Sequence, residues 1–303
     1  MSWWTGAALG FDTETDGPVP TEARIIESGL VLVTPGNAPN VMQVLIQPER
    51  DIPEEAIKIH GITTERAQEE GALREVGITQ IAVTIAELAS PSVPLVGHNA
   101  SYDLTLLDRE MRRIGLGHIS TDRETGLCVI NVGPATIGEP FPVIDTYVLD
   151  KAVDRYRKGK RQLSFAAEHY GVPMTEGAAH GAVADVFASL RIAWRISKVA
   201  AMAQDYLTTN QVAAKPLVLQ WHPFMKIYGG RRDPLDIVRA FAETDGMAAV
   251  ELHAAQRRWA VEQAEGLRDY FVKKGDTEAA ESVDGRWPVR PLAAIEDVDT
   301  TLI

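Results

Sequence analysis

Two acidic residues, Asp12 and Glu14, lie two positions apart at the end of the apolar run 7–11. Side chains on a strand alternate between its two faces, so both carboxylates would lie on one face. Two like charges in such a position repel each other unless a cation lies between them. Oxygen ligands suit hard cations such as Mg²⁺ and Mn²⁺. The pair therefore predicts a divalent-metal site, with a solvated strand end as the alternative.

A third acidic residue, Asp103, follows a short apolar strand and a Gly-His-Asn turn. Apolar residues spaced three and four apart predict a helix over about 101–114, with Asn99 or Ser101 as its cap. Asp103 would then lie in the first turn of this helix, where it could face the strand that carries Asp12. The alternative is that Asp103 interacts only with the helix dipole.

A histidine and a fourth acidic residue, His180 and Asp185, lie at the start of a predicted helix over about 181–199. Val183, Phe187, Leu190 and Trp194 are interpreted as the buried stripe of this helix. A buried aspartate on such a helix is costly unless it is paired or bound to a metal. The alternative is a solvated Asp185 beside a surface His180.

Taken in order along the chain, these segments resemble the three exonuclease motifs of the DnaQ-like family, the DEDDh 3′–5′ exonucleases. Residues 11–17 resemble the first motif and residues 97–103 the second, while His180 and Asp185 match the third. The resemblance covers about residues 5–198. This family includes the proofreading exonuclease subunits of bacterial DNA polymerases, and three ordered matches are more specific than any single motif.

The resemblance implies a metal-dependent 3′–5′ exonuclease that releases nucleoside 5′-monophosphates from single-stranded or frayed DNA ends. Two ions of Mg²⁺ or Mn²⁺, about 3.5–4 Å apart, would serve an in-line displacement at the phosphate. His180 would be the general base, since its side chain titrates near neutrality. The expected metal ligands are Asp12, Glu14, Asp103 and Asp185.

Other residues are expected to contact the nucleic acid. The stretch Ile59-His60-Gly61-Ile62-Thr63 resembles the family loop that lies against the terminal nucleotide. The basic cluster at 155–161 would steer the phosphates, and a solvated loop is the alternative. The expected substrate contacts are Thr13, Thr15, His60, Gly61, Ile62, Asn99, Lys158, Lys160 and Arg161.

DNA is the expected substrate, and a DNA polymerase is an expected partner. An exoribonuclease or oligonuclease of the same family is the nearest alternative, since no residue in the motifs clearly recognises a 2′-hydroxyl. A non-catalytic polymerase accessory module is the alternative from another class. The intact acidic set favours the enzyme, because a module without catalysis has no physical need for four converging carboxylates.

The apolar pattern also places the elements that would position these residues. Strands are predicted at about 6–12, 24–33 and 41–47, joined by short turns as in an antiparallel meander. Strands at 94–97 and 142–145, each followed by a helix, would add βαβ units. The sequence predicts an α/β fold with a mixed five-stranded sheet and helices on both faces, and the resemblance implies that this fold is ribonuclease H-like.

Residues 1–199 are interpreted as the exonuclease domain, with the Gly- and Pro-containing segment 117–141 as a loop insertion. Residues 200–303 are interpreted as a mainly helical C-terminal extension with a long helix at about 248–274. The extension is expected to pack on the catalytic domain or a partner without supplying a catalytic group. A protein ending near residue 200 is therefore expected to keep metal-dependent cleavage.

The composition agrees with this interpretation. The 303 residues carry a formal net charge of −12, which argues against a non-specific duplex binder. A single cysteine, Cys128, excludes an internal disulfide and a cysteine-based zinc cluster, so a reducing cytoplasm is expected. No stretch has the roughly 18 apolar residues of a membrane span, and the first residues lack the pattern of a signal peptide.

Overall fold

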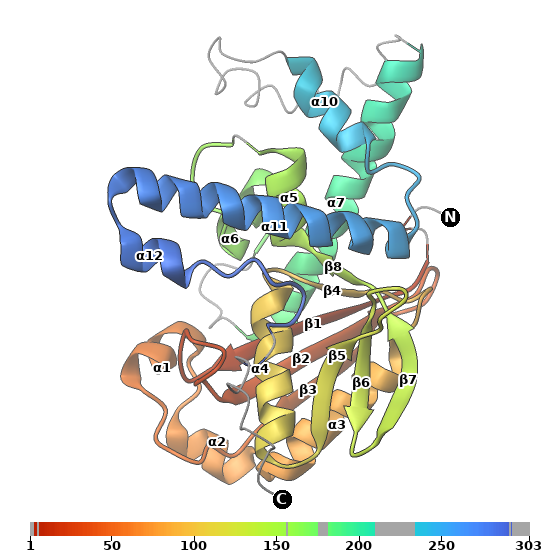
Figure 1. Ribbon diagram of the computed structural model, residues 1–303. Helices are drawn as coiled ribbons and strands as arrows, with labels where there is room; N and C mark the ends of the chain where they lie inside the picture. The colour runs from red at the N-terminus through yellow and green to blue at the C-terminus, as the bar shows by residue number, and fades with distance from the viewer. Residues whose placement is uncertain are drawn as a thin grey trace, which may run out of the picture.

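The computed structural model describes residues 3–4, 6–155, 157–174, 181–209, 234–290 and 292 (Figure 1). The strands are β1 (Ala8–Thr15), β2 (Ile25–Val33), β3 (Asn40–Leu45), β4 (Leu95–Gly97), β5 (Gly117–Thr121), β6 (Cys128–Val132), β7 (Ala135–Phe141) and β8 (Val143–Asp145). The helices are α1 (Glu54–His60), α2 (Thr64–Glu70), α3 (Arg74–Leu88), α4 (Ala100–Arg113), α5 (Thr146–Val153), α6 (Leu163–His169), α7 (Ala182–Thr209), α10 (Pro234–Ala242), α11 (Ala249–Lys274) and α12 (Thr277–Ser282).

The central sheet has five strands in the order β3-β2-β1-β4-β8. β1 pairs antiparallel with β2 and parallel with β4, while β2 pairs antiparallel with β3 and β4 pairs parallel with β8. The predicted α/β fold with a mixed five-stranded sheet is therefore confirmed. The carboxyl ends of β1, β4 and β8 meet at one edge, which is where ligands bind in sheets of this kind.

Helices cover both faces of the sheet because its strands alternate between two apolar clusters. Leu9 and Phe11 of β1 pack with buried residues of α3 and α4, such as Ile81 and Leu107. On the other face, Ala8 belongs to the cluster that includes buried residues of α7. Asp12 and Glu14 share the face of Ala8, which directs them toward α7.

The segment 117–141 is a second, three-stranded antiparallel sheet in the order β5-β6-β7, so the prediction of a loop insertion is wrong. Its strands bury Ile119, Ile130 and Phe141 in the cluster shared with α3 and α4. Glycines with positive φ, Gly126 and Gly133, lie in the two turns between these strands. They mark hairpin turns, in which positive φ favours glycine, and not one continuous loop.

Helix α7 continues to Thr209, so its predicted end near Lys198 is wrong. No glycine or proline interrupts 182–209, and nothing else in this stretch would stop a helix. Its buried face is also rotated from the predicted stripe, because Val186 and Leu190 are buried while Trp194 is 38% exposed. The proposed boundary between residues 199 and 200 falls inside this continuous helix.

The C-terminal helices pack on this core. The long helix predicted at 248–274 is confirmed as α11, which lies beside β8 and α5 (Figure 1). Helix α10 begins at Pro234 and packs against α7. Within the part of the chain that the structure describes, no helix is long and apolar enough to cross a membrane. Cys128 is a free, buried cysteine.

Candidate active site

Three carboxylates converge where β1 meets the first turn of α7. One carboxylate oxygen from each of Asp12, Glu14 and Asp185 lies within 4.8 Å of the others. Glycines allow this approach, since a Cβ at Gly10 would lie 2.4 Å from a methyl of Val186. The structure thus brings three of the four expected metal ligands together, and their role as ligands stays a prediction.

The fourth carboxylate, Asp103, comes from the first turn of α4 and is 4% exposed. Thr13 on β1 donates its hydroxyl to Asp103 Oδ1 at 2.6 Å. The charge of Asp103 also helps to raise the pKa of Asp12, second only to burial. Asp103 therefore faces the β1 carboxylates, and Thr13 fixes its orientation.

Burial and neighbouring negative charges raise the pKa values of Asp12, Glu14 and Asp103, which favours their protonated forms in the absence of metal. The pKa of Asp12 is well above its ordinary value because of burial and then the charges of Asp103, Asp185 and Glu14. Burial, then Asp185 and Glu27, raises the pKa of Glu14 to about 8. Burial raises the pKa of Asp103 to about 7, against the opposing hydrogen bond from Thr13.

The donor set fits a hard divalent cation. Glu14 Oε1 is buried and has no hydrogen-bond partner among the described residues. A buried acceptor in that state is costly unless a cation or another partner satisfies it. Asp12, Glu14 and Asp185 form a group of three carboxylates, and Asp103 lies near Asp12 outside that 4.8 Å group. Clustered carboxylates of this kind are the ligand chemistry that Mg²⁺ and Mn²⁺ prefer.

A further acidic residue beside the site, Glu27, was not singled out from the sequence. Glu27 of β2 lies opposite Glu14 in the antiparallel register and is 3% exposed. Its Oε2 accepts the backbone N–H of Ala182 at 3.3 Å, at the N-terminus of α7, where a negative charge is favourable. The signal in the sequence was a charged residue within the apolar strand 25–33.

The turn before Asp103 is held by buried polar contacts. His98 bonds to Thr146 Oγ1 through Nδ1 and to the carbonyl of Arg161 through Nε2, both at 2.8 Å. Asn99, one of the two predicted cap residues, is the N-cap of α4, but its φ is 63° and its side chain makes no capping hydrogen bond. The left-handed backbone is one that asparagine tolerates better than most residues.

The predicted nucleotide loop lies beside the end of β1. His60 is buried, its Nδ1 accepts the N–H of Ile62 at 3.0 Å, and burial lowers its pKa against the influence of the Thr15 backbone. Gly61 ends α1 with φ of 73°. Ile62 is 2% exposed, and Thr15 bonds to the hydroxyl of Tyr102 at 3.0 Å. These contacts bring the loop to the site, while any contact with a nucleotide stays a prediction.

The basic cluster divides into paired and exposed cations. Arg161 donates to Asp150 Oδ2 at 2.7 Å and to the carbonyl of Asp154 at 2.6 Å, and these contacts hold its guanidinium. Lys158 and Lys160 are exposed. Of the expected site residues, His180 lies outside the described part of the chain.

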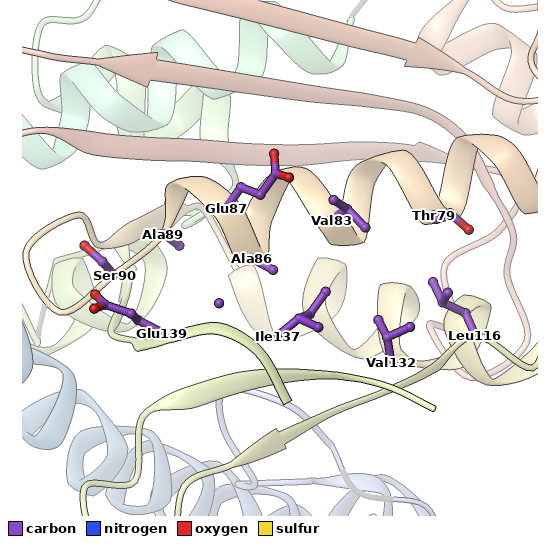
Figure 2. A pocket seen from close by; sticks show the side chains of 11 residues that line it. Thr79, Val83, Ala86, Glu87, Ala89, Ser90, Leu116, Val132, Ile137 and Glu139 are labelled. Carbon is purple, nitrogen blue, oxygen red and sulfur yellow. The ribbon is translucent and has the colours of Figure 1, made fainter. Parts of the chain in front are cut away.

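A separate apolar pocket of about 520 Å³ lies between α3 and β7 (Figure 2). Val83, Ala86 and Ile137 line it, and Glu87 and Glu139 lie at its wall. The pocket includes Ser90, which precedes β4 and so lies toward the amino ends of the parallel strands. The carboxylates lie at the opposite edge, so this pocket is not part of their site.

Comparisons with known proteins identify what this chain is similar to. A DNA polymerase III subunit epsilon-like protein of Rhodobacter capsulatus is 30% identical over 182 residues, or 59% of this chain and 22% of that protein. A PolC-type DNA polymerase III of Staphylococcus haemolyticus is 28% identical over 55% of this chain and 10% of that protein. The chain thus matches only a small part of each relative's length.

Among solved structures, E. coli exonuclease I in complex with a dT13 oligonucleotide is similar at 17% identity and a TM-score of 0.49. That similarity covers 68% of this chain and 44% of exonuclease I. The family model described as exonuclease (RNase_T) matches residues 9–193, which is more than half of the chain and includes all four acidic positions. The chain belongs to this exonuclease family.

Proposed function

We propose that this protein is a metal-dependent 3′–5′ exonuclease that hydrolyses single-stranded or frayed DNA ends to nucleoside 5′-monophosphates. The convergence of Asp12, Glu14 and Asp185 within 4.8 Å is the observation that carries the proposal. Membership of the exonuclease family supports it.

In this proposal, Asp12, Glu14, Asp103 and Asp185 hold two ions of Mg²⁺ or Mn²⁺. Bound ions of this kind would neutralise charge on the phosphate and favour an attacking water. His180 accepts a proton from the attacking water as general base. Thr13 keeps the Asp103 carboxylate oriented through its 2.6 Å hydrogen bond, and Glu27 keeps the start of α7 against β2.

The DNA contacts follow the same reasoning. His60, Gly61 and Ile62 are proposed to lie against the terminal nucleotide, as are Thr15 and Asn99, which border the acidic group. Lys158 and Lys160 are exposed and suited to phosphate, whereas Arg161 acts on the substrate indirectly by holding the loop to Asp150. A DNA polymerase partner is proposed from the names of the matched relatives, and the site of action is the cytoplasm.

The proposal is tested with purified full-length protein and 3′- or 5′-labelled single-stranded oligonucleotides in Mn²⁺ and in EDTA. Mononucleotides released one at a time from the 3′ end are the expected products, and EDTA should stop their release. Asp12→Ala is the matched inactive variant, since it removes a central carboxylate of the cluster. Parallel reactions on DNA and RNA of equal sequence separate the DNA exonuclease from an exoribonuclease.

Three outcomes would contradict the proposal. Faster release from RNA than from DNA would favour the exoribonuclease. Full activity of Asp12→Ala would remove the metal site from the chemistry. An absence of cleavage by a well-folded protein that still binds a polymerase would favour an accessory module.

A further inference from the structure

The free edge of the central sheet is closed by side chains from α11. β8 is the last strand in the sheet order, so one side of its backbone has no strand partner. His253 Nδ1 accepts the N–H of Val143 at 2.9 Å, and Gln256 Oε1 accepts the N–H of Asp145 at 2.9 Å. Gln256 also donates to the carbonyl of Val143 at 3.3 Å. Both side chains are fully buried, so α11 satisfies the strand edge as a neighbouring strand would.

The chain after α12 continues from this edge to α4. Trp287 is 9% exposed, packs on His253 with ring centroids 5.0 Å apart, and donates its indole N–H to Asp145 Oδ2 at 3.1 Å. The backbone N–H of Arg290 then bonds to Thr105 Oγ1 at 2.9 Å. Residues 287–290 thus join β8 to the helix whose first turn carries Asp103 (Figure 1). These residues are called the C-terminal strap below.

Asp145 connects the strap to the turn of the second motif. Its Oδ2 accepts the indole N–H of Trp287, and its Oδ1 accepts the backbone N–H groups of Asn99 and Tyr147, each of the latter two at 2.9 Å. The Asn99 contact lies at the left-handed residue that starts α4, four positions before Asp103. The charge of Asp145 is also among the causes that raise the pKa of Asp103, so the two carboxylates lie in the same region.

We propose that the C-terminal strap is a positioning element for hydrolysis, in which Trp287 orients Asp145 and Asp145 orients the Asn99 turn and the Asp103 ligand. This inference rests on the proposed function. It gives the C-terminal extension a role in the active site without giving it a catalytic residue. Loss of the indole N–H leaves a buried carboxylate oxygen without its donor, and such an oxygen reorients or draws in water. Asn99 and Asp103 then lose their fixed placement.

The test compares Trp287→Phe with Trp259→Phe in the full-length protein. Both substitutions remove the same indole portion from a tryptophan of the extension. Trp259 is half-buried on α11, and its indole N–H donates no hydrogen bond to any residue that the structure describes. The readouts are Mn²⁺ affinity by calorimetry and kcat and KM on a single-stranded oligonucleotide, at a temperature where both variants are folded.

Trp287→Phe is expected to weaken Mn²⁺ binding and lower kcat by about tenfold, the low end for loss of a partner that orients a metal ligand. KM should change little, and Trp259→Phe should resemble the wild type.

Rescue of the Trp287→Phe variant by a second substitution provides another readout. Asp145→Asn keeps the acceptor for Asn99 and removes the unpaired charge, so it should restore part of the loss in the Trp287→Phe background. In the wild-type background, Asp145→Asn places its side-chain NH₂ against the Trp287 indole N–H, so two donors face each other. This single variant should therefore lower Mn²⁺ affinity and kcat.

The outcomes separate this inference from the proposed function. Equal Mn²⁺ affinity and kcat in the two tryptophan variants, even with a lower melting temperature for Trp287→Phe, would reduce the strap to a stabilising contact and overturn the inference. A wild-type protein that binds Mn²⁺ but cleaves nothing would contradict the proposed function, while the Mn²⁺ comparison would still decide the role of Trp287.

Discussion

At the scale of single residues, the carboxylates of the acidic site repel one another, and a bound metal cation would reduce this repulsion. Asp12, Glu14, Asp103 and Asp185 come from three elements, β1, α4 and α7, and no basic side chain stands among the causes that shift the pKa of Asp12 or Glu14. Without metal, the fold must keep protons on these groups or accept their repulsion. The cost of keeping the group together should therefore depend on pH and on metal.

The metal-free protein should lose stability as pH rises from about 4.5 to about 8. The folded-state pKa of Glu14 is about 8 and that of Asp103 is about 7, both above their ordinary values. The folded state then binds more protons than the unfolded state in this window, so the free energy of unfolding falls with increasing pH. Glu14→Gln should raise stability in EDTA at pH 8.5 by several kcal/mol, on the order of 4–5, and leave it nearly unchanged at pH 4.5.

Thermal unfolding in EDTA across this pH range measures the effect, with the exposed Glu262→Gln on α11 as a matched control of equal charge change. Saturating Mn²⁺ should reverse the order, because the wild type has the complete ligand set. An unchanged pH profile for Glu14→Gln would mean that Glu14 is already ionised in the metal-free fold.

His180 is expected to set the acidic limb of the pH–rate profile. A general base works only in its unprotonated form, so kcat should rise with pH as His180 loses its proton. His180→Ala should lower kcat by about 10²–10⁴-fold, remove that limb and keep Mn²⁺ affinity. The measurement is kcat between pH 5.5 and 9, and a normal rate with the limb intact would assign the base elsewhere.

At the scale of elements, the position of α7 decides whether Asp185 reaches β1. The start of α7 lies against β2 at Gly29, where an added Cβ would be 2.6 Å from the backbone nitrogen of Val183 and 2.7 Å from the carbonyl carbon of Ala182. Glu27, two residues earlier on β2, accepts the N–H of Ala182. The strand therefore holds the helix through one close backbone approach and one charged hydrogen bond.

Gly29→Ala should displace α7 and separate Asp185 from Asp12. The atoms in the way are backbone, so rotation of a side chain cannot relieve the overlap, and about 1–3 kcal/mol of stability should be lost. Activity should fall about tenfold, with weaker Mn²⁺ binding, because displacing the helix that carries Asp185 weakens the proposed metal site.

Gly266→Ala is the matched control. Gly266 is exposed on α11 and an added Cβ would have nothing within 4 Å, so this substitution should stabilise the helix by about 0.4–1 kcal/mol. Normal Mn²⁺ affinity in a folded Gly29→Ala protein would contradict this role for the close approach.

The elements also explain how far the sequence could be interpreted. The positions of the proposed metal ligands on β1, α4 and α7 were predictable because local patterns carry them: strand alternation for Asp12 and Glu14, and helix starts for Asp103 and Asp185. The β5-β6-β7 sheet was missed because its short strands are separated by glycines that also suit a loop. Long-range contacts leave no local pattern, so the pairing of Trp287 with Asp145, 142 positions apart, could be found only in the structure.

At the scale of the whole molecule, the proposed substrate, a DNA strand, has the same sign of charge as this acidic protein. The net charge is −12, and part of the basic cluster is already engaged within the fold. Arg157 and Arg161 both pair with Asp150, which is fully buried, so their charges are offset locally. Lys158 and Lys160 remain exposed on the same loop, with Lys160 5.5 Å from the ring centroid of Phe165. We therefore expect exposed cations of this loop, such as Lys158 and Lys160, to provide much of the attraction for a DNA strand there.

Lys158→Ala combined with Lys160→Ala should raise KM for a single-stranded oligonucleotide several-fold and leave kcat near the wild-type value, because these lysines would bind phosphates away from the reacting bond. The dependence of log(kcat/KM) on log[salt] should become shallower by about 0.7 for each phosphate that a lysine no longer neutralises. Lys273→Ala with Lys274→Ala on α11 removes the same charge from an exposed helix end and is the matched control. Arg161→Ala should differ from both double-lysine variants, because it removes one partner of the buried Asp150. Its main effect should be a lower melting temperature, with a smaller change in the salt slope. Equal changes in salt slope for the two double-lysine variants would show that overall charge attracts the strand and that the 158–160 loop does not bind it.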